Sequence, residues 1–430
     1  MRKRIDFILT WKRIGAAAAA GVVAAFALGW SGMVPISASS GHFPPFGWFL
    51  HWVMGNAAEK QSLAVSVPDD LDLSDPALVK RGAGHFATGC AVCHGSPTEA
   101  QSPVVLSMTP HPPRLEGRVP EWSDRELFWI VQHGIKYTGM PAWPTQARAD
   151  EVWAQVAFLR ALPGMSPAAY DDLALASGAD GGIDSGNGAQ NAILSDGAEL
   201  AFEDALADCA RCHGRDGYGR GPAGAFPVLA GQPADYLLAS LQAYSNGERA
   251  SGFMQPPARR YDAEMLARLA EHFAGVEGPD GPAATGPIGT DAAATALPAD
   301  APKTETERAV PEEAASGPPD TREGLLALGR RLAENGLPER KLPACESCHA
   351  ADGANREPAR NAVYPRLAGQ PEWYLKTQLH LWKEGERGGT AYAHVMTNIA
   401  KHLTEEQIDA AATWYGQTAP GDGRHQEIRP

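Results

Sequence analysis

The six cysteines of this 430-residue chain all occur in C-x-x-C pairs, and a histidine directly follows each pair. The motifs are Cys90-Ala-Val-Cys93-His94, Cys209-Ala-Arg-Cys212-His213 and Cys345-Glu-Ser-Cys348-His349. On one turn of helix this spacing brings two thiols to the edge of a single porphyrin, and the imidazole can then bind its iron. The motifs therefore predict three covalently bound haem c groups, with the cysteines as attachment sites and the histidines as axial ligands.

Paired cysteines also occur in zinc sites and in redox-active thiol pairs. A structural zinc site needs four ligands, and no C-x-x-C pair here is closely followed by a second pair or by two spaced histidines. A thioredoxin-like pair requires a βαβ context, which the sequence pattern lacks. Because the three motifs use every cysteine, the sequence favours haem attachment.

A methionine follows each haem motif and is the expected second axial ligand. It lies 41 to 47 residues beyond the histidine, at Met140, Met254 and Met396. A neutral thioether closes the iron for electron transfer and raises its potential. In the last unit His394 and His402 are alternative ligands.

A P-x-L tripeptide recurs after each haem motif, at Pro113-Arg114-Leu115, Pro227-Val228-Leu229 and Pro365-Arg366-Leu367. One interpretation is that it places a backbone carbonyl against the imidazole N–H and so fixes the ring. The other is a simple turn before a helix. The sequence leaves the two interpretations level.

Self-comparison shows that the chain contains homologous units. The segment 230–249 (AGQPADYLLASLQAYSNGER) recurs as 368–387 (AGQPEWYLKTQLHLWKEGER), and an earlier unit has the same order of parts without it. Apolar spacing and capping residues predict a closing helix in every unit, at 150–162, at 262–273 and after Thr404. We therefore expect three small all-α domains joined by exposed linkers. The expected boundaries are 67–166 for domain 1, 167–194 for a linker, 195–276 for domain 2, 277–321 for a Pro/Ala-rich linker, 322–418 for domain 3 and 419–430 for a tail.

The first 66 residues have the pattern of a membrane anchor. Five basic residues within the first 13 precede a run from Ile14 to Ile36 that carries no charge. Such a run can cross a bilayer, and its basic flank is expected to stay in the cytoplasm. We predict a basic tip and transmembrane helix over 1–36 and an aromatic juxtamembrane segment over 37–66. A cleaved signal peptide is the alternative, because small residues follow at 37–40.

The formal net charge of -14 argues against nucleic acid as a partner. An acidic surface suits basic redox proteins, and it would equally keep an exported protein soluble.

On these motifs, the chain resembles class I cytochromes c, in which a few helices surround one haem with histidine and methionine ligands. Residues 195–416 resemble the dihaem cytochrome c4 type, through F-P-x-L-A-G-Q-P-x-x-Y-L at 226–237 and, with Tyr364 replacing phenylalanine, at 364–375. By this resemblance Met254 and Met396 match the axial methionines of the family. Domain 1, with its haem motif and Thr138-Gly139-Met140-Pro141, resembles a separate class I domain.

The resemblance implies electron transfer rather than catalysis by this chain. We expect a cytochrome anchored in a bacterial inner membrane that relays electrons in the periplasm. Its partners would be respiratory-chain redox proteins: a quinol-oxidising complex or dehydrogenase as donor, and an acceptor such as a terminal oxidase. The alternative is the cytochrome subunit of a membrane-bound alcohol or sugar dehydrogenase, because such enzymes have three-haem subunits. A peroxidase would need a five-coordinate iron, which a methionine in every unit disfavours.

Overall fold

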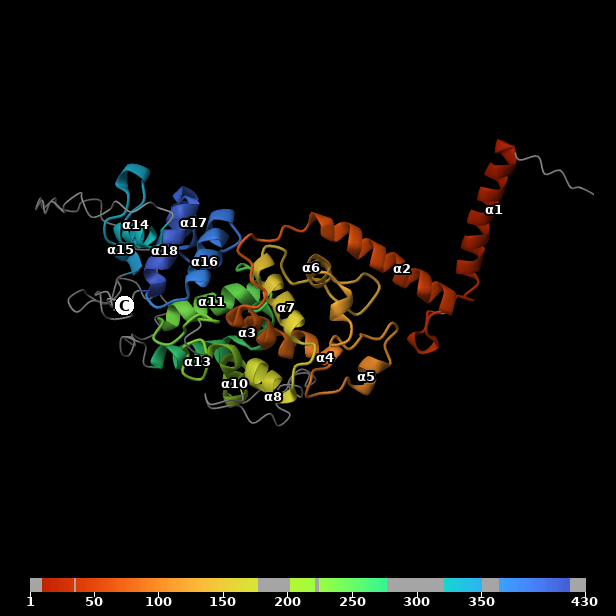
Figure 1. Ribbon diagram of the computed structural model, residues 1–430, viewed down its shortest axis with the longest axis horizontal. Helices are drawn as coiled ribbons and strands as arrows, with labels where there is room; N and C mark the ends of the chain where they lie inside the picture. Colours follow the sequence, from red (N-terminus) through yellow and green to blue (C-terminus); the bar gives the residue numbers. More distant parts are fainter. Residues whose placement is uncertain are drawn as a thin grey trace, which may run out of the picture.

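The computed structural model describes residues 10–34, 36–176, 202–220, 224–276, 321–349 and 363–417. Within these ranges the chain is helical, with two isolated β-bridges and no strand, which confirms the predicted all-α class. Figure 1 shows a helical body from which one N-terminal helix projects. Residues 177–188, and those of the predicted Pro/Ala-rich linker before residue 321, lie outside the described ranges.

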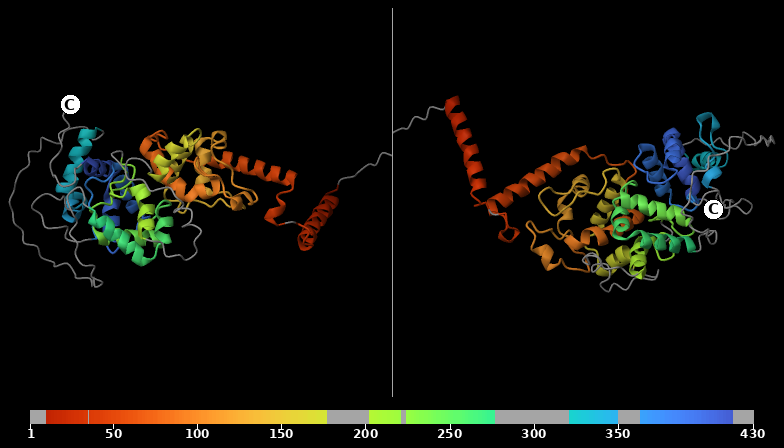
Figure 2. Two further views of the ribbon diagram at one scale, coloured as in Figure 1. Left: turned by 90° about the horizontal axis from the view of Figure 1, so that it is seen from below. Right: turned by 180° about the vertical axis from the view of Figure 1, so that it is seen from behind.

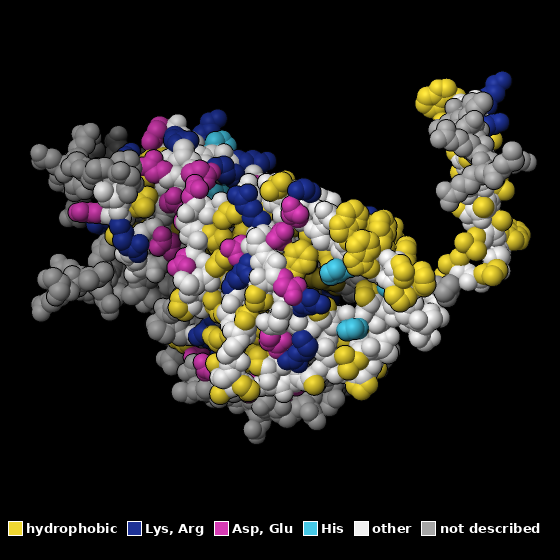
Figure 3. Space-filling view, turned by 45° about the vertical axis from the view of Figure 1, so that its right-hand side comes forward, with side chains coloured by type: hydrophobic (Ala, Val, Ile, Leu, Met, Phe, Trp, Pro, Cys, Tyr) yellow, Lys and Arg dark blue, Asp and Glu magenta, His cyan; other side chains and the backbone are white. Residues whose placement is uncertain are grey.

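The projecting helix is α1 (Trp11–Trp30), an apolar helix of 20 residues, none of them buried. It is the one helix of the described chain that is long and apolar enough to cross a membrane. Helix α2 (Pro44–Gln61) connects it to the body, as both views in Figure 2 show. The side chains of Trp48 and Trp52 on α2 are exposed, and Figure 3 shows apolar side chains gathered beside α1. The sequence did not predict this second helix.

Domain 1 is built around the crossing of α3 (Pro76–His85) and α7 (Ala149–Ala161). Asp75 caps α3, where its carboxylate accepts a hydrogen bond from Ala77 N and Pro76 takes the first helical position. The core contains Phe86, which directly follows α3, together with Phe158 and other side chains of these helices. The remaining elements are a π-helical turn (Phe86–Cys90), α4 (Ala91–His94), α5 (Pro103–Leu106), α6 (Asp124–His133), α8 (Pro167–Tyr170) and a second π-helical turn (Asp171–Leu175).

The first residues of the predicted linker 167–194 pack against domain 1. Tyr170 on α8 and Ala174 in the following π-helical turn are buried in the same core as Phe86. Leu173 and Leu175 pack against the same core, so the segment buries enough apolar surface to fold back onto the domain.

Domains 2 and 3 repeat one helical arrangement. Domain 2 comprises α10 (Phe202–His213), α11 (Ala234–Asn246), α12 (Gln255–Arg260) and α13 (Ala263–Gly275). Domain 3 comprises α14 (Arg322–Glu334), α15 (Glu346–His349), α16 (Glu372–Glu384), α17 (Ala393–His402) and α18 (Glu405–Gln417). Short 3-10 turns occupy Ala38–Ser40, Ser62–Ala64, Val119–Glu121 and Pro338–Arg340. The closing helices α7, α13 and α18 begin within about one residue of their predicted starts, and the repeated segments contain α11 and α16.

Glycines allow the main helix crossings of domains 1 and 3. A Cβ atom on Gly82 of α3 would lie 2.1 Å from the carbonyl oxygen of Ala154 on α7. A Cβ atom on Gly329 of α14 would lie 2.2 Å from the carbonyl oxygen of Ala410 on α18. The two domains therefore share the same close backbone contact.

The three domains meet at one tryptophan. Trp373 of α16 donates a hydrogen bond from Nε1 to the carbonyl oxygen of Gly224 in domain 2, at 2.6 Å. The guanidinium of Arg81, on α3 of domain 1, lies 3.9 Å from the centre of the same ring. This contact fixes α3 beside both other domains.

Candidate haem-binding sites

The three C-x-x-C-H motifs lie at helical turns, as their spacing predicted. Cys90 ends a π-helical turn before α4, Cys209 and Cys212 lie on α10, and Cys345 precedes α15. All six thiols are unpaired and partly buried. Burial raises the pKa of Cys90 to about 12 and that of Cys345 to about 11, which disfavours the thiolate that zinc or disulfide exchange would need. The described residues also contain no group of three or more His, Cys, Asp or Glu that could hold a metal ion.

Each motif histidine forms the same hydrogen bond with the proline of its P-x-L tripeptide. The Nδ1 atoms of His94, His213 and His349 lie 2.8, 3.0 and 2.9 Å from the carbonyl oxygens of Pro113, Pro227 and Pro365. A carbonyl can only accept, so Nδ1 carries the proton and Nε2 keeps its lone pair for a metal. Of the two interpretations of the tripeptide, the structure supports the one that fixes the imidazole.

The histidines are held in the neutral form that binds iron. Burial lowers the pKa of His213 and His349, although the hydrogen bond to the proline carbonyl acts in the opposite direction. The pKa of His94 is lowered by burial in the same way. All three imidazoles are therefore unprotonated at Nε2 near neutral pH.

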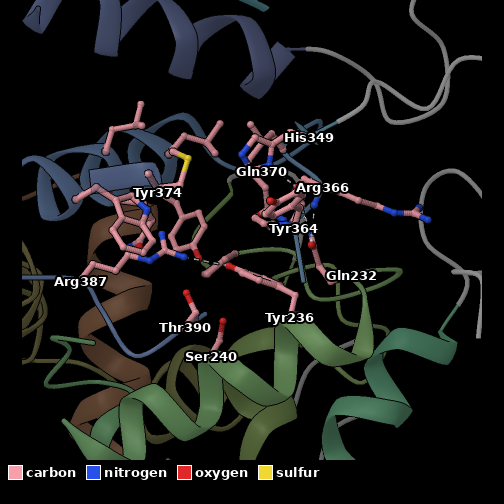
Figure 4. Close-up of a pocket in the computed structure, with 18 of the residues that line it drawn as sticks. Gln232, Tyr236, Ser240, His349, Tyr364, Arg366, Gln370, Tyr374, Arg387 and Thr390 are labelled. Atoms are coloured by element: carbon pink, nitrogen blue, oxygen red, sulfur yellow. Dashed lines mark hydrogen bonds between the residues drawn. The ribbon is translucent and has the colours of Figure 1, made fainter. Parts of the chain in front are cut away.

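One apolar cavity between domains 2 and 3 contains two of the predicted sites. His213 and Met254 line it from domain 2, and His349 and Met396 line it from domain 3, together with Cys209, Cys345 and Cys348. Its walls are mainly leucine and tyrosine side chains. Figure 4 shows Tyr236 and Ser240 on α11 facing Tyr374 and Arg387 across this cavity. The fourth cysteine, Cys212, does not line the cavity and packs against Phe226 and α3 instead.

The alternative ligands in domain 3 lie away from the cavity. His394 and His402 are exposed and do not line it, and His402 Nδ1 is bonded to the carbonyl oxygen of Asn398 on its own helix, at 2.7 Å. Met396 of the same helix does line the cavity. The geometry thus favours the methionine as the candidate ligand.

Met140 is held in a separate site in domain 1. Its backbone N donates to Thr138 Oγ1 at 3.1 Å, and its carbonyl oxygen accepts from Ile135 N at 3.2 Å, which closes a tight loop after α6. Its side chain is partly buried. Met108 lies next to this loop, because a Cβ atom on Gly139 would touch its terminal methyl group.

Two buried arginines test whether the shared cavity fits a haem. Arg249 is 3% exposed and Arg387 is 9% exposed, and neither forms an ion pair with any described carboxylate. Arg249 Nε has no hydrogen-bond partner among the described residues. Buried cations require compensating negative charge. A haem carries two propionate carboxylates, so the charge, the apolar walls and the ligand set all fit this cofactor.

Paired cysteines beside neutral, oriented imidazoles in an apolar helical cavity define a c-type cytochrome. A family model described as cytochrome c matches residues 194–271 and 326–418, and one described as cytochrome c oxidase, cbb3-type, subunit III matches residues 77–159. The chain belongs to the cytochrome c family. Its cofactor is covalently bound haem c, and it is an electron-transfer protein rather than an enzyme.

The curated relatives match about half of the chain. The thiosulfate dehydrogenase electron acceptor of Stutzerimonas stutzeri is 32% identical over 207 residues, which cover 48% of this chain and 77% of the relative. Cytochrome c4 of Azotobacter vinelandii is 30% identical over 228 residues, which cover 51% of this chain and 88% of that protein. The structure of reduced cytochrome c4 from Pseudomonas stutzeri is 24% identical with a TM-score of 0.36, and it covers 52% of this chain and 100% of that one.

Sequence reasoning missed the polar residues that join the domains. Gln232, Gln370, Arg249 and Arg387 lie within the repeated segment, and their recurrence was the available signal. Glu151 of α7, which also contacts domain 2, carries no such signal.

Proposed function

We propose that this protein is a membrane-anchored cytochrome with three haems that relays electrons in the periplasm from a respiratory donor to an acceptor such as a terminal oxidase. The observation that carries the proposal is the histidine–proline hydrogen bond, which occurs in all three domains with the same geometry. The repetition of this arrangement in each domain supports one haem per domain and three in the chain.

The proposed haem sites combine the following residues. Domain 1 would attach haem through Cys90 and Cys93 and ligate it with His94 and Met140. Domain 2 would use Cys209, Cys212, His213 and Met254, and domain 3 would use Cys345, Cys348, His349 and Met396. We also propose the boundaries 67–166, 195–276 and 322–418 for the three domains, with residues 167–175 packed against the core of the first.

The chain's own side chains would prepare each site for rapid electron transfer. Bound haem supplies a one-electron Fe(III)/Fe(II) couple. The proline carbonyls hold the motif imidazoles in one tautomer, and the leucine and tyrosine walls would exclude water. Arg249 and Arg387 would neutralise the charge of the haem propionates, which would favour a higher potential. A methionine bound as the second ligand would leave no open position on iron for a substrate.

The N-terminal helices support the proposed location. Helix α1 is apolar and unburied, and the aromatic residues of α2 are exposed directly after it. We propose that α1 crosses the inner membrane with its basic tip in the cytoplasm, and that α2 lies at the periplasmic surface of the bilayer.

A test combines haem content with ligand spectroscopy on the matured full-length chain. We expect three haems per chain, all low-spin in electron paramagnetic resonance, with methionine-to-iron charge-transfer absorption. Changing Met140, Met254 or Met396 singly to alanine should each remove about one third of that absorption, one haem of three. A high-spin haem or a bis-histidine haem in the unaltered chain would refute the ligand assignment.

A second candidate function is the cytochrome subunit of a membrane-bound dehydrogenase. The observation that favours it is the similarity of domains 2 and 3 to proteins named thiosulfate dehydrogenase electron acceptor. Alcohol or sugar dehydrogenases remain alternatives for such a complex. Purification of the native protein from membranes decides between the two functions, since a dehydrogenase partner that co-purifies stoichiometrically would support the second.

A further inference from the structure

Domain 1 contacts the loop of domain 2 that carries Met254. The contact centres on Glu151, a residue of α7 that is only 2% exposed. One carboxylate oxygen of Glu151 accepts from Ser251 Oγ and the other from Gly252 N, both at 2.5 Å. Both donors belong to domain 2, so this carboxylate of one domain orders the backbone of another.

The hydrogen bonds continue from Glu151 to Met254. Ser251 Oγ, which donates its proton to Glu151, accepts a hydrogen bond from Met254 N at 3.0 Å. The carbonyl oxygen of Ser251 also accepts from Gln255 N at 3.1 Å, at the start of α12. Glu151 therefore fixes the serine hydroxyl in the orientation that holds the methionine backbone.

The buried charge of Glu151 is balanced within domain 1. Arg148 lies 2.9 Å from the Glu151 carboxylate and also donates to the carbonyl oxygen of Ala250, at 3.2 Å. Trp143 Nε1 lies within 3.3 Å of the second carboxylate oxygen. With these partners an ionised carboxylate can remain buried at the interface.

Aromatic packing fixes the residue between Gly252 and Met254. The ring of Phe253 stacks on that of His85, with centroids 4.9 Å apart and an angle of 28° between the planes. It also meets the ring of Trp143 edge to face, at 5.7 Å. The indole lies so close to Gly252 that a Cβ atom there would come within 2.2 Å of Nε1. Domain 1 thus contacts each residue from Ala250 to Phe253.

Among the described residues, the methionine of domain 3 has no comparable support. Met396 lies within α17, and the backbone before it is bonded locally, from Ala393 N to the carbonyl oxygen of Thr390 and from Val395 N to that of Tyr392. Domains 2 and 3 share one arrangement of helices but differ at this point. The proposed haem site of domain 3 therefore serves as the internal reference against which the effect of Glu151 on the site of domain 2 is measured.

We propose that Glu151 is a positioning residue for the second haem site: it acts through Ser251 to hold Met254 in place as an axial ligand, so that domain 1 sets the potential of the haem in domain 2. The proposal rests on the ligand role of Met254 proposed above. A thioether held firmly on iron stabilises the ferrous state, so a loosened loop lowers the potential of this one haem.

The experiment uses the matured full-length chain with Glu151→Gln and Ser251→Ala. Glutamine keeps the size of the side chain but replaces one accepting oxygen with an NH2 group, and alanine removes the relaying hydroxyl. We expect both variants to lose up to about one third of the methionine-to-iron absorption, one haem of three, and to lower one of the three potentials. Because the two residues act in series, the double variant should lose no more than the stronger single variant.

Two further variants keep the outcomes distinct. Glu126→Gln is the matched control, because it makes the same charge change in domain 1. The Glu126 carboxylate accepts hydrogen bonds from Ser123 in the cap of α6, so this variant should leave all three potentials unchanged.

Met254→Ala identifies which part of the methionine-to-iron absorption belongs to the haem of domain 2. If Met254→Ala leaves the absorption intact, the proposed ligand is wrong. If Met254→Ala removes one third but Glu151→Gln and Ser251→Ala change neither absorption nor potential, the positioning role is overturned. Ser251→Ala keeps the test valid if Glu151→Gln destabilises domain 1.

Discussion

Gln232 and Gln370 form the same pair of hydrogen bonds in opposite directions across the contact between domains 2 and 3. Gln232 donates to the carbonyl oxygen of Arg366 at 2.9 Å and accepts from its N at 3.0 Å. Gln370 donates to the carbonyl oxygen of Val228 at 2.8 Å and accepts from its N at 3.1 Å. The two contacted residues are the central residues of equivalent P-x-L tripeptides, so the interface has approximate two-fold symmetry.

The other end of the repeated segment follows the same symmetry. Arg249 donates to Tyr374 Oη at 2.9 Å, and Arg387 donates to Tyr236 Oη at 3.3 Å. The backbones of Arg249 and Arg387 form an antiparallel bridge. The repeat therefore contributes an interface as well as a helix, and the candidate haem-binding residues of both domains line the cavity at this interface.

Gln232→Ala and Gln370→Ala should destabilise the chain by similar amounts. Each removes two hydrogen bonds and leaves a partly buried N–H without its partner, at a cost of about 1–3 kcal/mol. Denaturant unfolding of the haem-loaded chain, followed by haem absorption, measures the loss. Gln146→Ala is the control, because that side chain forms one exposed hydrogen bond within domain 1. If only one of the two interface variants lost much of its free energy of unfolding, the two glutamines would not have equivalent roles at the interface.

Gly82→Ala and Gly329→Ala should each loosen a helix crossing. The added methyl group would overlap the backbone of α7 or α18, and overpacking of this kind costs about 1–3 kcal/mol. Thermal unfolding should show a lower midpoint for both variants. Gly275→Ala, at the end of α13, is the matched control because a Cβ atom there meets nothing within 4 Å. An unchanged midpoint for Gly82→Ala would mean that α3 and α7 can separate without cost.

The sequence predicted local features well because each depends on nearby residues. The haem motifs and the closing helices lie within short segments with strong spacing rules. For the P-x-L tripeptide the sequence left two interpretations level, because its carbonyl meets an imidazole 14 to 19 residues away. Contacts between domains depend on how whole folds pack, and no spacing rule describes them. Glu151 illustrates the limit, because beside Asp150 it resembles an ordinary acidic residue in the first turn of a helix. Helix α2 was missed because its aromatic run resembles a membrane-interface segment of any conformation.

Burial of His85 should make the chain less stable in mild acid. Burial lowers the pKa of His85 from 6.5 to about 4, so the unfolded chain binds a proton that the folded chain does not bind between these values. The contribution of neutral His85 to the free energy of unfolding is fully present above pH 6.5 and is lost as the pH falls toward 4. At pH 5 the loss is about 2 kcal/mol relative to pH 8.

His85→Phe isolates this effect, because phenylalanine can keep the stacking on Phe253 but cannot bind a proton. Unfolding free energies of both chains at pH 8 and pH 5 give the comparison, and the difference between the chains cancels the other titrating groups. We expect the variant to lose about 2 kcal/mol less than the unaltered chain. Equal losses would show that His85 does not stay neutral in the folded protein.

Membrane association should depend on α1 and, more weakly, on α2. With α1 retained, the chain should remain in the membrane fraction at high salt and be released by detergent, because about 20 apolar residues insert effectively irreversibly. A chain exported without residues 1–36 should bind lipid vesicles weakly and reversibly through the exposed aromatic side chains of α2. Adding Trp48→Ser and Trp52→Ser should abolish that binding, whereas Tyr218→Ser, an exposed aromatic residue of domain 2, should not. A mature chain that begins after residue 36 would instead identify the N-terminal run as a cleaved signal peptide, and the weak binding by α2 would then be the whole membrane affinity of the protein.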